Sequence, residues 1–549
     1  MDLILTFFTA LLLTTALIPI SIKYSGNWRL MWRLEDVPGA GRKVHTQPIR
    51  RVGGICIIFS VFIAVSYWMT PLEGAWRELW GLCVGSIILA IFGFLDDCFD
   101  LNYKLKFLGQ ILAILPLLFS GIFFESVPLL GVTPAAQWLA LPLTFCFMLG
   151  VINAVNLADG LDGLAAGIMV LSLALIAFFA VQSGQHDVAL ISVGVIGGLL
   201  GFLRFNTHPA RAFMGDSGSQ FLGFVTAAVA IKVTQYDAIA VSPLLPLLLI
   251  GLPVMDTLLV IALRVYHHRP PFQADKNHTH HQLLKLGLLH YEAVAVIYLL
   301  QAALLSVAWF FRYENDSILL GSYLLFCGGV LGLIWLGRRK HWRLHPELAP
   351  VGRENRNQFL RRFEWFYVHA PRVIEVVLGL FFIAVALRVE TATPVLANIA
   401  PGLAAAGGIL WVLQGVTRLP PPAVTRVLVY SVGAVLLYAL LIDKAYRPVF
   451  NTAIDVYLAL ALLILLLAIR MTRREVFRLD TQDLLVLMFV LVVPALPMGG
   501  FTDIDLGRLT LRFAVILYCC EYLLSKKMHD YRLLNTATIV SMLLLARIV

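Results

Sequence analysis

Charged residues are scarce in this chain. Only 14% of its 549 residues are Asp, Glu, Lys or Arg, whereas 60% are hydrophobic. A soluble globular domain has about 25% charged and about 45–50% apolar residues, so the composition excludes an ordinary water-soluble fold. Apolar stretches of about 20 residues, enough to cross a bilayer as a helix, recur from one terminus to the other. We therefore expect an all-α fold, a polytopic integral membrane helical bundle.

Cysteine is also scarce, and no two cysteines form a CxxC pair. The seven cysteines lie mostly inside or beside apolar stretches. This distribution favours buried thiols packed between helices over zinc ligands or disulfides. Short-period repeats and low-complexity tracts are absent from the sequence as well.

The apolar stretches predict two sets of membrane spans, about 11 followed by about 7, separated by a polar segment at 337–371. The first set lies near 3–22, 53–70, 80–95, 107–123, 136–152, 163–182, 188–203, 218–234, 244–263, 291–311 and 317–336. The second set lies near 373–389, 396–415, 425–441, 452–470, 484–498, 508–524 and 533–548.

The formal net charge is +9, and the positive charge sits mostly in the short connections between spans. With the N-terminus outside, Lys and Arg gather in alternate connections, as the positive-inside rule expects, so those connections face the cytoplasm. The basic segment 341–371 reads as a linker at the anionic inner leaflet. Contact with membrane lipid explains the charge, and we expect no nucleic-acid partner. Asp2 and the lack of a basic leader favour an uncleaved first span.

Polar clusters occupy the cytoplasmic connections. The segment GRKVHTQPIRRVGG at 41–54 carries Lys43 and His45, which could meet a phosphate, although topology alone explains part of its charge. Asp96 and Asp97 stand together at the end of a span. Adjacent carboxylates repel unless a cation lies between them, and Mg²⁺ prefers such oxygen ligands. The alternative is a solvated helix end.

The segment NAVNLADGLDGLAAG at 153–167 holds Asn153, Asn156, Asp159 and Asp162. Asp159 and Asp162 are three residues apart and share a face if the turn is helical. The glycines would let backbone amides approach a phosphate. An ordinary turn seldom needs so many side-chain ligands, so a binding role is favoured.

Two further clusters follow. In RFNTHPARAFMGDSGSQFLG at 204–223, Asn206 offers a polar contact and Asp216 precedes a new span, where it could bind a ligand or cap the helix. In HHRPPFQADKNHTHHQLLKLG at 267–287, Asp275, His278, His280 and His281 stand close together. HxHH lacks the usual zinc spacing, so cationic or hydrogen-bonding imidazoles against a pyrophosphate are favoured.

Asp256 lies inside an apolar span. An intramembrane carboxylate indicates either a functional group or a structural hydrogen bond to another helix, and the sequence leaves both open.

Taken together, these segments resemble the bacterial polyprenyl-phosphate N-acetylhexosamine-1-phosphate transferases, which are relatives of phospho-N-acetylmuramoyl-pentapeptide transferase. The resemblance runs through DD at 96–97, NxxNxxDGxDGLA at 153–165, FMGDSGS at 213–219 and PFxADxxHxHHxLLxLG at 271–287, and it covers residues 1–340. RKxH at 42–45 and HTHH are more similar to the N-acetylglucosamine-type members, because the HHHFE ending of the pentapeptide branch is absent.

The resemblance implies a reaction between a UDP-sugar and polyprenyl phosphate that gives polyprenyl-diphospho-sugar and UMP, with Mg²⁺ or with Mn²⁺ in its place. It implies a metal site at Asp216 with Asp97. The implied catalytic residues are Asp96, Asp97, Asp216, His280 and His281. The implied substrate-binding residues are Lys43, His45, Asn153, Asn156, Asp159, Asp162, Asn206, Asp275 and His278. Direct attack and a covalent phospho-Asp intermediate are both left open.

The resemblance also implies residence in the bacterial inner membrane. It makes residues 1–340 the catalytic domain, 341–371 a cytoplasmic linker and 372–549 a C-terminal membrane domain, which we expect to serve packing or partner binding. A homodimer is left open. Two rival functions are a transporter and an inactive scaffold for polysaccharide assembly. Transporters place polar sites near the midplane, however, whereas here the polar groups cluster at the cytoplasmic ends of spans.

Overall fold

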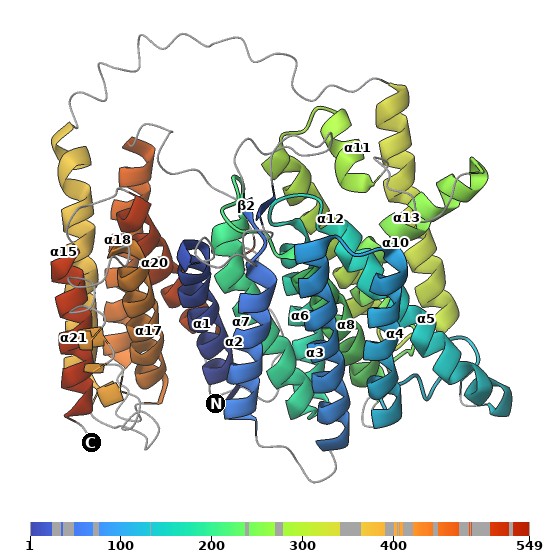
Figure 1. The fold of residues 1–549 in the computed structure, drawn as a ribbon. Coiled ribbons are helices and arrows are strands. Elements are labelled where there is room, and N and C mark those ends of the chain that lie inside the picture. Colours follow the sequence, from blue (N-terminus) through green and yellow to red (C-terminus); the bar gives the residue numbers. More distant parts are fainter. Residues whose placement is uncertain are drawn as a thin grey trace. The chain divides into compact units, whose positions relative to one another are not determined.

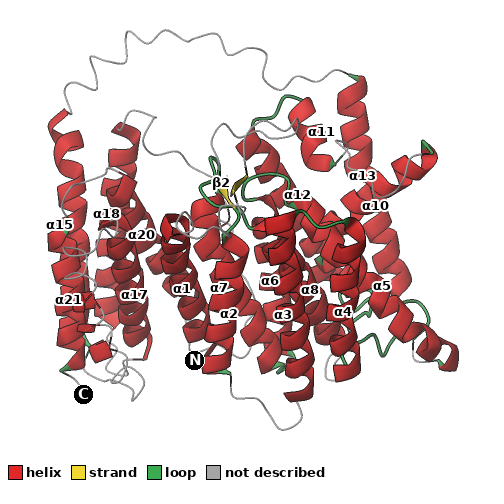
Figure 2. Ribbon diagram, in the orientation of Figure 1, coloured by secondary structure: helices red, strands yellow, loops and turns green. Residues whose placement is uncertain are grey.

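The computed structural model describes residues 2–24, 35–36, 49–69, 76–131, 133–235, 241–268, 278–340, 364–389, 400–402, 404–405, 407–409, 421–442, 448–471, 483, 485, 506–525 and 531–547. Helices dominate this part of the chain (Figure 2). Its strands are short: β1 (Glu35–Asp36) pairs antiparallel with β2 (Ile49–Arg50). Ten of the described helices are long and apolar enough to cross a membrane. The prediction of an all-α polytopic membrane protein is confirmed.

The helices fall into two compact units, and α1 to α13 form the first (Figure 1). Its helices are α1 (Asp2–Tyr24), α2 (Gly53–Trp68), α3 (Trp76–Phe99), α4 (Tyr103–Ser120), α5 (Pro134–Ala158), α6 (Leu164–Gln182), α7 (His186–Asn206), α8 (Gly215–Thr234), α9 (Leu245–Leu249), α10 (Gly251–Tyr266), α11 (Thr279–Lys285), α12 (His290–Phe311) and α13 (Asp316–Arg339).

The core of this unit is built on α6, α7 and α8. In the most apolar stretches of α6 and α7, 83% of the residues are buried in the protein, against 33% in α4 and 22% in α13. The outer helices expose large apolar side chains such as Phe119, Trp138 and Leu325. Lipid tails are as apolar as these side chains, so contact with the bilayer accounts for their exposure.

Glycine allows two helices to approach α8 closely. A side chain at Gly54 of α2 would come within 2.4 Å of the Gly218 nitrogen, and one at Gly93 of α3 within 2.4 Å of the Ser217 Cα. Small residues at such crossings let two backbones come into contact. As a result, the end of α3 lies against the start of α8.

The single span predicted at 244–263 is wrong, because the helix breaks between α9 and α10. Pro253 has no N–H to donate to the Leu249 carbonyl, which instead accepts a hydrogen bond from Gln301 Nε2 at 3.0 Å. The Gly251 carbonyl accepts one from the Tyr323 hydroxyl at 2.9 Å. Side chains of α12 and α13 thus satisfy backbone groups that the break leaves exposed.

Successive helices of this unit alternate in direction, so the polar connections meet at one end. Figure 1 shows that end at the top, with β2 and α11 beside it. Arg50 and Gly53, before and at the start of α2, hydrogen-bond to Phe213 before α8: the Phe213 N–H donates to the Arg50 carbonyl and the Gly53 N–H to the Phe213 carbonyl, both at 2.9 Å. Connections far apart in sequence are therefore tied together.

The second unit contains α15 (Glu364–Arg388), α17 (Pro421–Ile442), α18 (Pro448–Met471), α20 (Leu506–Ser525) and α21 (Arg532–Ala546). Its interior holds charged groups that sequence analysis did not single out. Arg426 of α17 bonds Glu521 of α20 through Nε at 2.6 Å and Nη2 at 3.1 Å, and the Tyr430 hydroxyl donates to Glu521 at 2.5 Å. The predicted span at 484–498 lies almost wholly outside the described residues, and that at 396–415 only partly inside.

All seven cysteines lie in described segments, and none of them forms a disulfide there. Cys56, Cys98, Cys519 and Cys520 are buried, as predicted, and Cys83 and Cys327 are partly buried. The prediction is wrong for Cys146, which is exposed on α5.

Candidate active site

The acidic centre lies where α3 ends and α8 begins. Asp97 turns both carboxylate oxygens toward the start of α8: Oδ1 accepts from the Asp216 N–H at 2.9 Å, and Oδ2 accepts from the Ser217 N–H at 3.1 Å and the Ser217 hydroxyl at 3.0 Å. The first amides of a helix have no partner within it and carry partial positive charge, so a carboxylate there is stabilised. Asp97 therefore caps α8 from another helix.

Asp96 and Asp216 converge on one cation. The Lys106 ammonium, on α4, lies 2.5 Å from Asp96 Oδ2 and 3.0 Å from Asp216 Oδ2. The side chain of Asp216 is 26% exposed, whereas those of Asp96 and Asp97 are 2% and 1% exposed. Asp216 is thus the carboxylate of this centre that a ligand can reach most readily.

The loop between α5 and α6 borders the acidic centre. Burial, together with the negative charges of Asp216, Asp162 and Asp97, raises the pKa of Asp159 to about 7. Asn156 Oδ1 accepts a hydrogen bond from the Ser219 hydroxyl at 2.8 Å. Two predicted binding residues therefore lie next to the start of α8.

Asn206 and Asn153 hold the framework. Asn206 Oδ1 accepts from the Gly163 N–H at 2.9 Å, and its amide donates to the Ala212 carbonyl at 2.9 Å, which ties two of the predicted motifs together. Asn153 donates to Gln110 Oε1 at 2.9 Å and to the Leu149 carbonyl at 2.8 Å. Its amide group thus braces α4 against α5.

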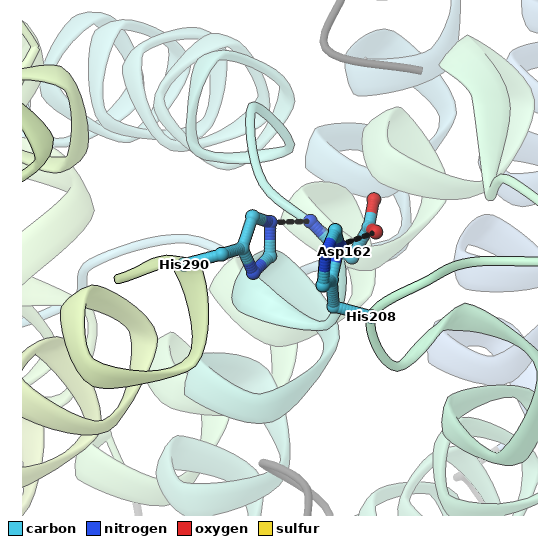
Figure 3. A group of neighbouring side chains, drawn as sticks. All are labelled: Asp162, His208 and His290. Carbon is cyan, nitrogen blue, oxygen red and sulfur yellow. Dashed lines mark hydrogen bonds and ion pairs between the residues drawn. The ribbon is translucent and has the colours of Figure 1, made fainter. Parts of the chain in front are cut away.

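Asp162 belongs to a cluster with His208 and His290 (Figure 3). Its Oδ2 lies 2.8 Å from His208 Nδ1 and accepts from the Ala210 N–H at 3.1 Å. Its own N–H donates to His290 Nε2 at 3.3 Å, and the two imidazoles stack with centroids 4.2 Å apart. Neither histidine was predicted from the sequence, because a single His in a connection carries no signal of its partner.

The HxHH segment forms the short helix α11 and its N-terminal flank. A side chain at Gly160 would come within 2.5 Å of His280 Nε2, so the His280 ring lies directly over the loop that carries Asp159. Burial, helped by the neighbouring His281, lowers the pKa of His280 to about 3. His280 is therefore neutral near pH 7, which favours the hydrogen-bonding alternative over the cationic one. His281 is the more exposed of the two.

Three predicted site residues, Lys43, His45 and Asp275, lie outside the described residues. Arg51, close to the first two in sequence, places Nη1 3.7 Å from Asp97 Oδ1. Lys106 was not among the predicted site residues. It lies just before the span predicted at 107–123, beside the equally basic Lys104, so the sequence did not distinguish it from a charge that serves topology.

The donor groups at this end can hold a metal ion in two places. Asp96 and Asp216 supply carboxylate oxygens of the kind Mg²⁺ and Mn²⁺ take, and Lys106 between them marks a point built for positive charge. Asp162, His208 and His290 place their candidate ligand atoms within 4.8 Å of one another. These atoms also hydrogen-bond among themselves, and that is how the structure uses them.

A pair of carboxylates around a cation, beside glycine-rich backbone and neutral imidazoles, suits chemistry on phosphate. Phosphoryl transfer depends mainly on positioning and charge neutralisation, and these groups can supply both.

Comparison with known proteins also indicates chemistry on phosphate. Residues 79–234 match the model for glycosyl transferase family 4. The chain is 36% identical over 301 residues to the probable undecaprenyl-phosphate N-acetylglucosaminyl 1-phosphate transferase of Bacillus subtilis. The aligned region covers 54% of this chain and 80% of the relative.

Two more relatives extend the comparison. The decaprenyl-phosphate N-acetylglucosaminephosphotransferase of Mycolicibacterium smegmatis is 38% identical over 287 residues, with 47% of this chain and 70% of the relative covered. The phospho-N-acetylmuramoyl-pentapeptide-transferase of Geobacillus kaustophilus is 35% identical over 271 residues, with 46% and 79% covered. Each matches about half of this chain.

Proposed function

The chain belongs to glycosyl transferase family 4, and from this premise we propose that it transfers N-acetylglucosamine 1-phosphate from UDP-N-acetylglucosamine to a polyprenyl phosphate, releasing UMP. One observation carries the proposal: Asp96 and Asp216 meet around Lys106 beside the loop that holds Asp159. The donor sugar follows from the names of the relatives and from the RKxH and HTHH segments.

In the reaction, an oxygen of the polyprenyl phosphate attacks the β-phosphorus of the UDP-sugar. A new P–O bond forms there, the P–O bond to the α-phosphate breaks, and UMP leaves with that bridging oxygen. Both reactants are anions, so the site must offset their repulsion. Lys106 and Arg51 supply positive charge near the acidic centre.

The three carboxylates of the acidic centre have different roles. We assign a divalent metal to Asp216 and Asp96, because both oxygens of Asp97 accept hydrogen bonds from the start of α8, whereas Asp96 gives only Oδ1 to a backbone amide, that of Leu101 at 2.7 Å, and turns Oδ2 toward Lys106. Bound there, Mg²⁺ or Mn²⁺ would neutralise diphosphate charge and stabilise the leaving UMP. Asp97, the predicted metal ligand, holds Asp216 in place.

The remaining predicted residues bind the two substrates. His281 is the more exposed imidazole of the pair and contacts a phosphate oxygen, with neutral His280 packed behind it. Asp159, Asn156 and Asp162 hold the nucleotide-sugar through the loop. Lys43 and His45 are proposed to contact phosphate, and Asp275 to bind another part of a substrate.

The location follows from the charge pattern. The Lys and Arg bias of the connections supports an active site at the cytoplasmic face of the bacterial inner membrane. We assign catalysis to residues 1–340, a linker role to 341–371 and a packing or partner-binding role to 372–549. The partner of 372–549 could be a second copy of the chain, which would make a homodimer. Such a reaction would initiate synthesis of a cell-surface polysaccharide.

The test uses the full chain, purified in detergent, with undecaprenyl phosphate, Mg²⁺ and radiolabelled UDP-N-acetylglucosamine. We expect label in the organic phase only when lipid and metal are both present, and none from Asp216→Asn. The matched control is Asp187→Asn, which should retain activity. Asp187 lies in the first turn of α7 and bonds to Lys232 of α8. Lack of labelled lipid from folded wild type, with UDP-N-acetylgalactosamine also tried, would leave a transporter or a scaffold as the better account.

A further inference from the structure

Asp256 lies in α10, outside the five polar segments, and its side chain is nearly buried. Its carboxylate serves the HxHH segment. Oδ2 lies 2.7 Å from His278 Nδ1, while Oδ1 accepts from the Thr279 N–H at 2.6 Å and the Thr279 hydroxyl at 2.5 Å. All three bonds come from the two residues at which α11 begins.

A carboxylate inside an apolar helix is costly unless its oxygens are satisfied, so this arrangement calls for a physical account. The helix it holds, α11, has 7 residues. So short a helix has little stability of its own and needs contacts from elsewhere to keep its place. Asp256 supplies such a contact from a helix of the bundle.

The bonds to Asp256 also fix the imidazoles. In a neutral His278, Nδ1 is the donor to the carboxylate, so Nε2 carries the lone pair. The His278 and His280 rings stack at 9° with centroids 5.7 Å apart, and the His280 and His281 centroids are 4.3 Å apart. The series of rings thus runs from Asp256 to His281, the most exposed of the three imidazoles.

The backbone at Gly160 contacts the same three imidazoles from the other side. The His280 ring occupies the space that a side chain at residue 160 would need. The imidazoles are therefore held between a carboxylate on α10 and bare backbone in the loop before α6. Displacement of either support moves the rings relative to the acidic centre.

We propose that Asp256 is a positioning residue for the transfer reaction: its carboxylate orients the HxHH segment so that His281 meets the substrate phosphates. This inference rests on the proposed function, and it assigns Asp256 no contact with substrate.

The test compares Asp256→Asn with wild type in the lipid-labelling assay. Asn can accept from Thr279, but its amide faces His278 with a donor, so the bond to a charged group that fixes the ring and its tautomer is lost. We expect kcat to fall about 10- to 100-fold, the usual scale for a displaced catalytic group, while KM for UDP-N-acetylglucosamine changes less than threefold. The loss of kcat should persist well below the melting temperature of the variant, where the protein is fully folded, which a purely structural role would not allow.

Two further variants sharpen the result. Asp316→Asn is the matched control, because Asp316 also accepts from a backbone N–H, that of Leu129 at 2.6 Å, and from a hydroxyl, that of Ser242. It should leave kcat unchanged. Gly160→Ala pushes on the His280 ring from the other side and should lower kcat alone. The double variant Asp256→Asn/Gly160→Ala should lose less than the product of the two single losses, because both displace the same rings.

The outcomes separate the two levels of inference. No labelled lipid from wild type would contradict the proposed function itself. An active wild type with Asp256→Asn as active as Asp316→Asn, or with losses that multiply in the double variant, would overturn the positioning role alone. A variant that melts far below wild type and recovers full kcat when refolded at low temperature would show a structural role instead.

Discussion

Replacing Asp97 by Asn should loosen the start of α8 and so misplace Asp216. The carboxylate accepts three hydrogen bonds, from the Asp216 N–H, the Ser217 N–H and the Ser217 hydroxyl. Asn keeps one acceptor oxygen and turns an NH₂ group toward the remaining donor. With its oxygen in the place of Oδ2, Asn keeps both Ser217 bonds and loses the one from the Asp216 N–H. A bond to a charged group contributes about 1.5–3 kcal/mol, so this loss costs about 1.5–3 kcal/mol before relaxation.

This loss is measurable without any assay of activity. In detergent at pH 8 with EDTA, Asp97→Asn should melt below wild type by about 3–6 °C. Asp216→Asn removes the ion pair with Lys106 and, at the same time, the repulsion from Asp96 and Asp97, so its melting temperature should fall less than that of Asp97→Asn under the same conditions. If Asp97→Asn melts with wild type while Asp216→Asn melts lower, Asp97 is no cap and the division of work among the carboxylates is wrong.

Three other perturbations test separate parts of the structure. Lys106→Met leaves Asp96 and Asp216 without their shared cation, an interaction of about 4 kcal/mol per pair at an effective dielectric of 20. Mg²⁺ should therefore raise the melting temperature of the variant more than that of wild type. Equal shifts in the two proteins would contradict this. Because the pKa of Asp159 rises from 3.8 to about 7 on folding, its ionisation destabilises the fold as pH rises through 7. Asp159→Asn in EDTA should therefore melt above wild type at pH 8, with the gap narrowing toward pH 5, and a gap independent of pH would refute the assignment. Arg426→Met leaves Glu521 buried and uncompensated and should destabilise the second unit by about 3–5 kcal/mol, whereas Arg426→Met/Glu521→Gln should recover most of that loss in a denaturation series.

Most helices could be predicted because membrane spans are long and uniformly apolar. The span expected at 163–182 is α6 at Leu164–Gln182, and the one expected at 291–311 is α12 at His290–Phe311. The break between α9 and α10 was missed although Pro253 was visible in the sequence. Proline in a membrane helix is tolerated when distant groups satisfy the freed carbonyl, and Gln301 could not be identified as that group from sequence alone.

The candidate site was predictable in membership more than in arrangement. Acidic residues at the ends of spans marked Asp96, Asp97 and Asp216, because charge in an apolar chain needs a reason. Which carboxylate faces the helix start and which faces Lys106 depends on the close approach of α3 to α8 at Gly93. Such a packing contact leaves no local pattern in the sequence.

The histidines illustrate the same limit. HxHH stood out because its imidazoles are adjacent in sequence, whereas His208 and His290 join Asp162 only through the fold. Asp256 was visible as an anomaly, and its partners became known only when α10 and α11 were placed together. Contacts between segments that are distant in sequence are the part of this site that composition and spacing cannot predict.

The most direct test of the central claim follows each phosphorus of the donor. UDP-N-acetylglucosamine labelled with ³²P at either the α or the β position is incubated with the purified chain, undecaprenyl phosphate and Mg²⁺. We predict that β-label enters the lipid and that α-label is released as UMP, with neither event in Asp216→Ala. Release of both labels together as UDP would mean that the sugar alone is transferred, and it would contradict the account.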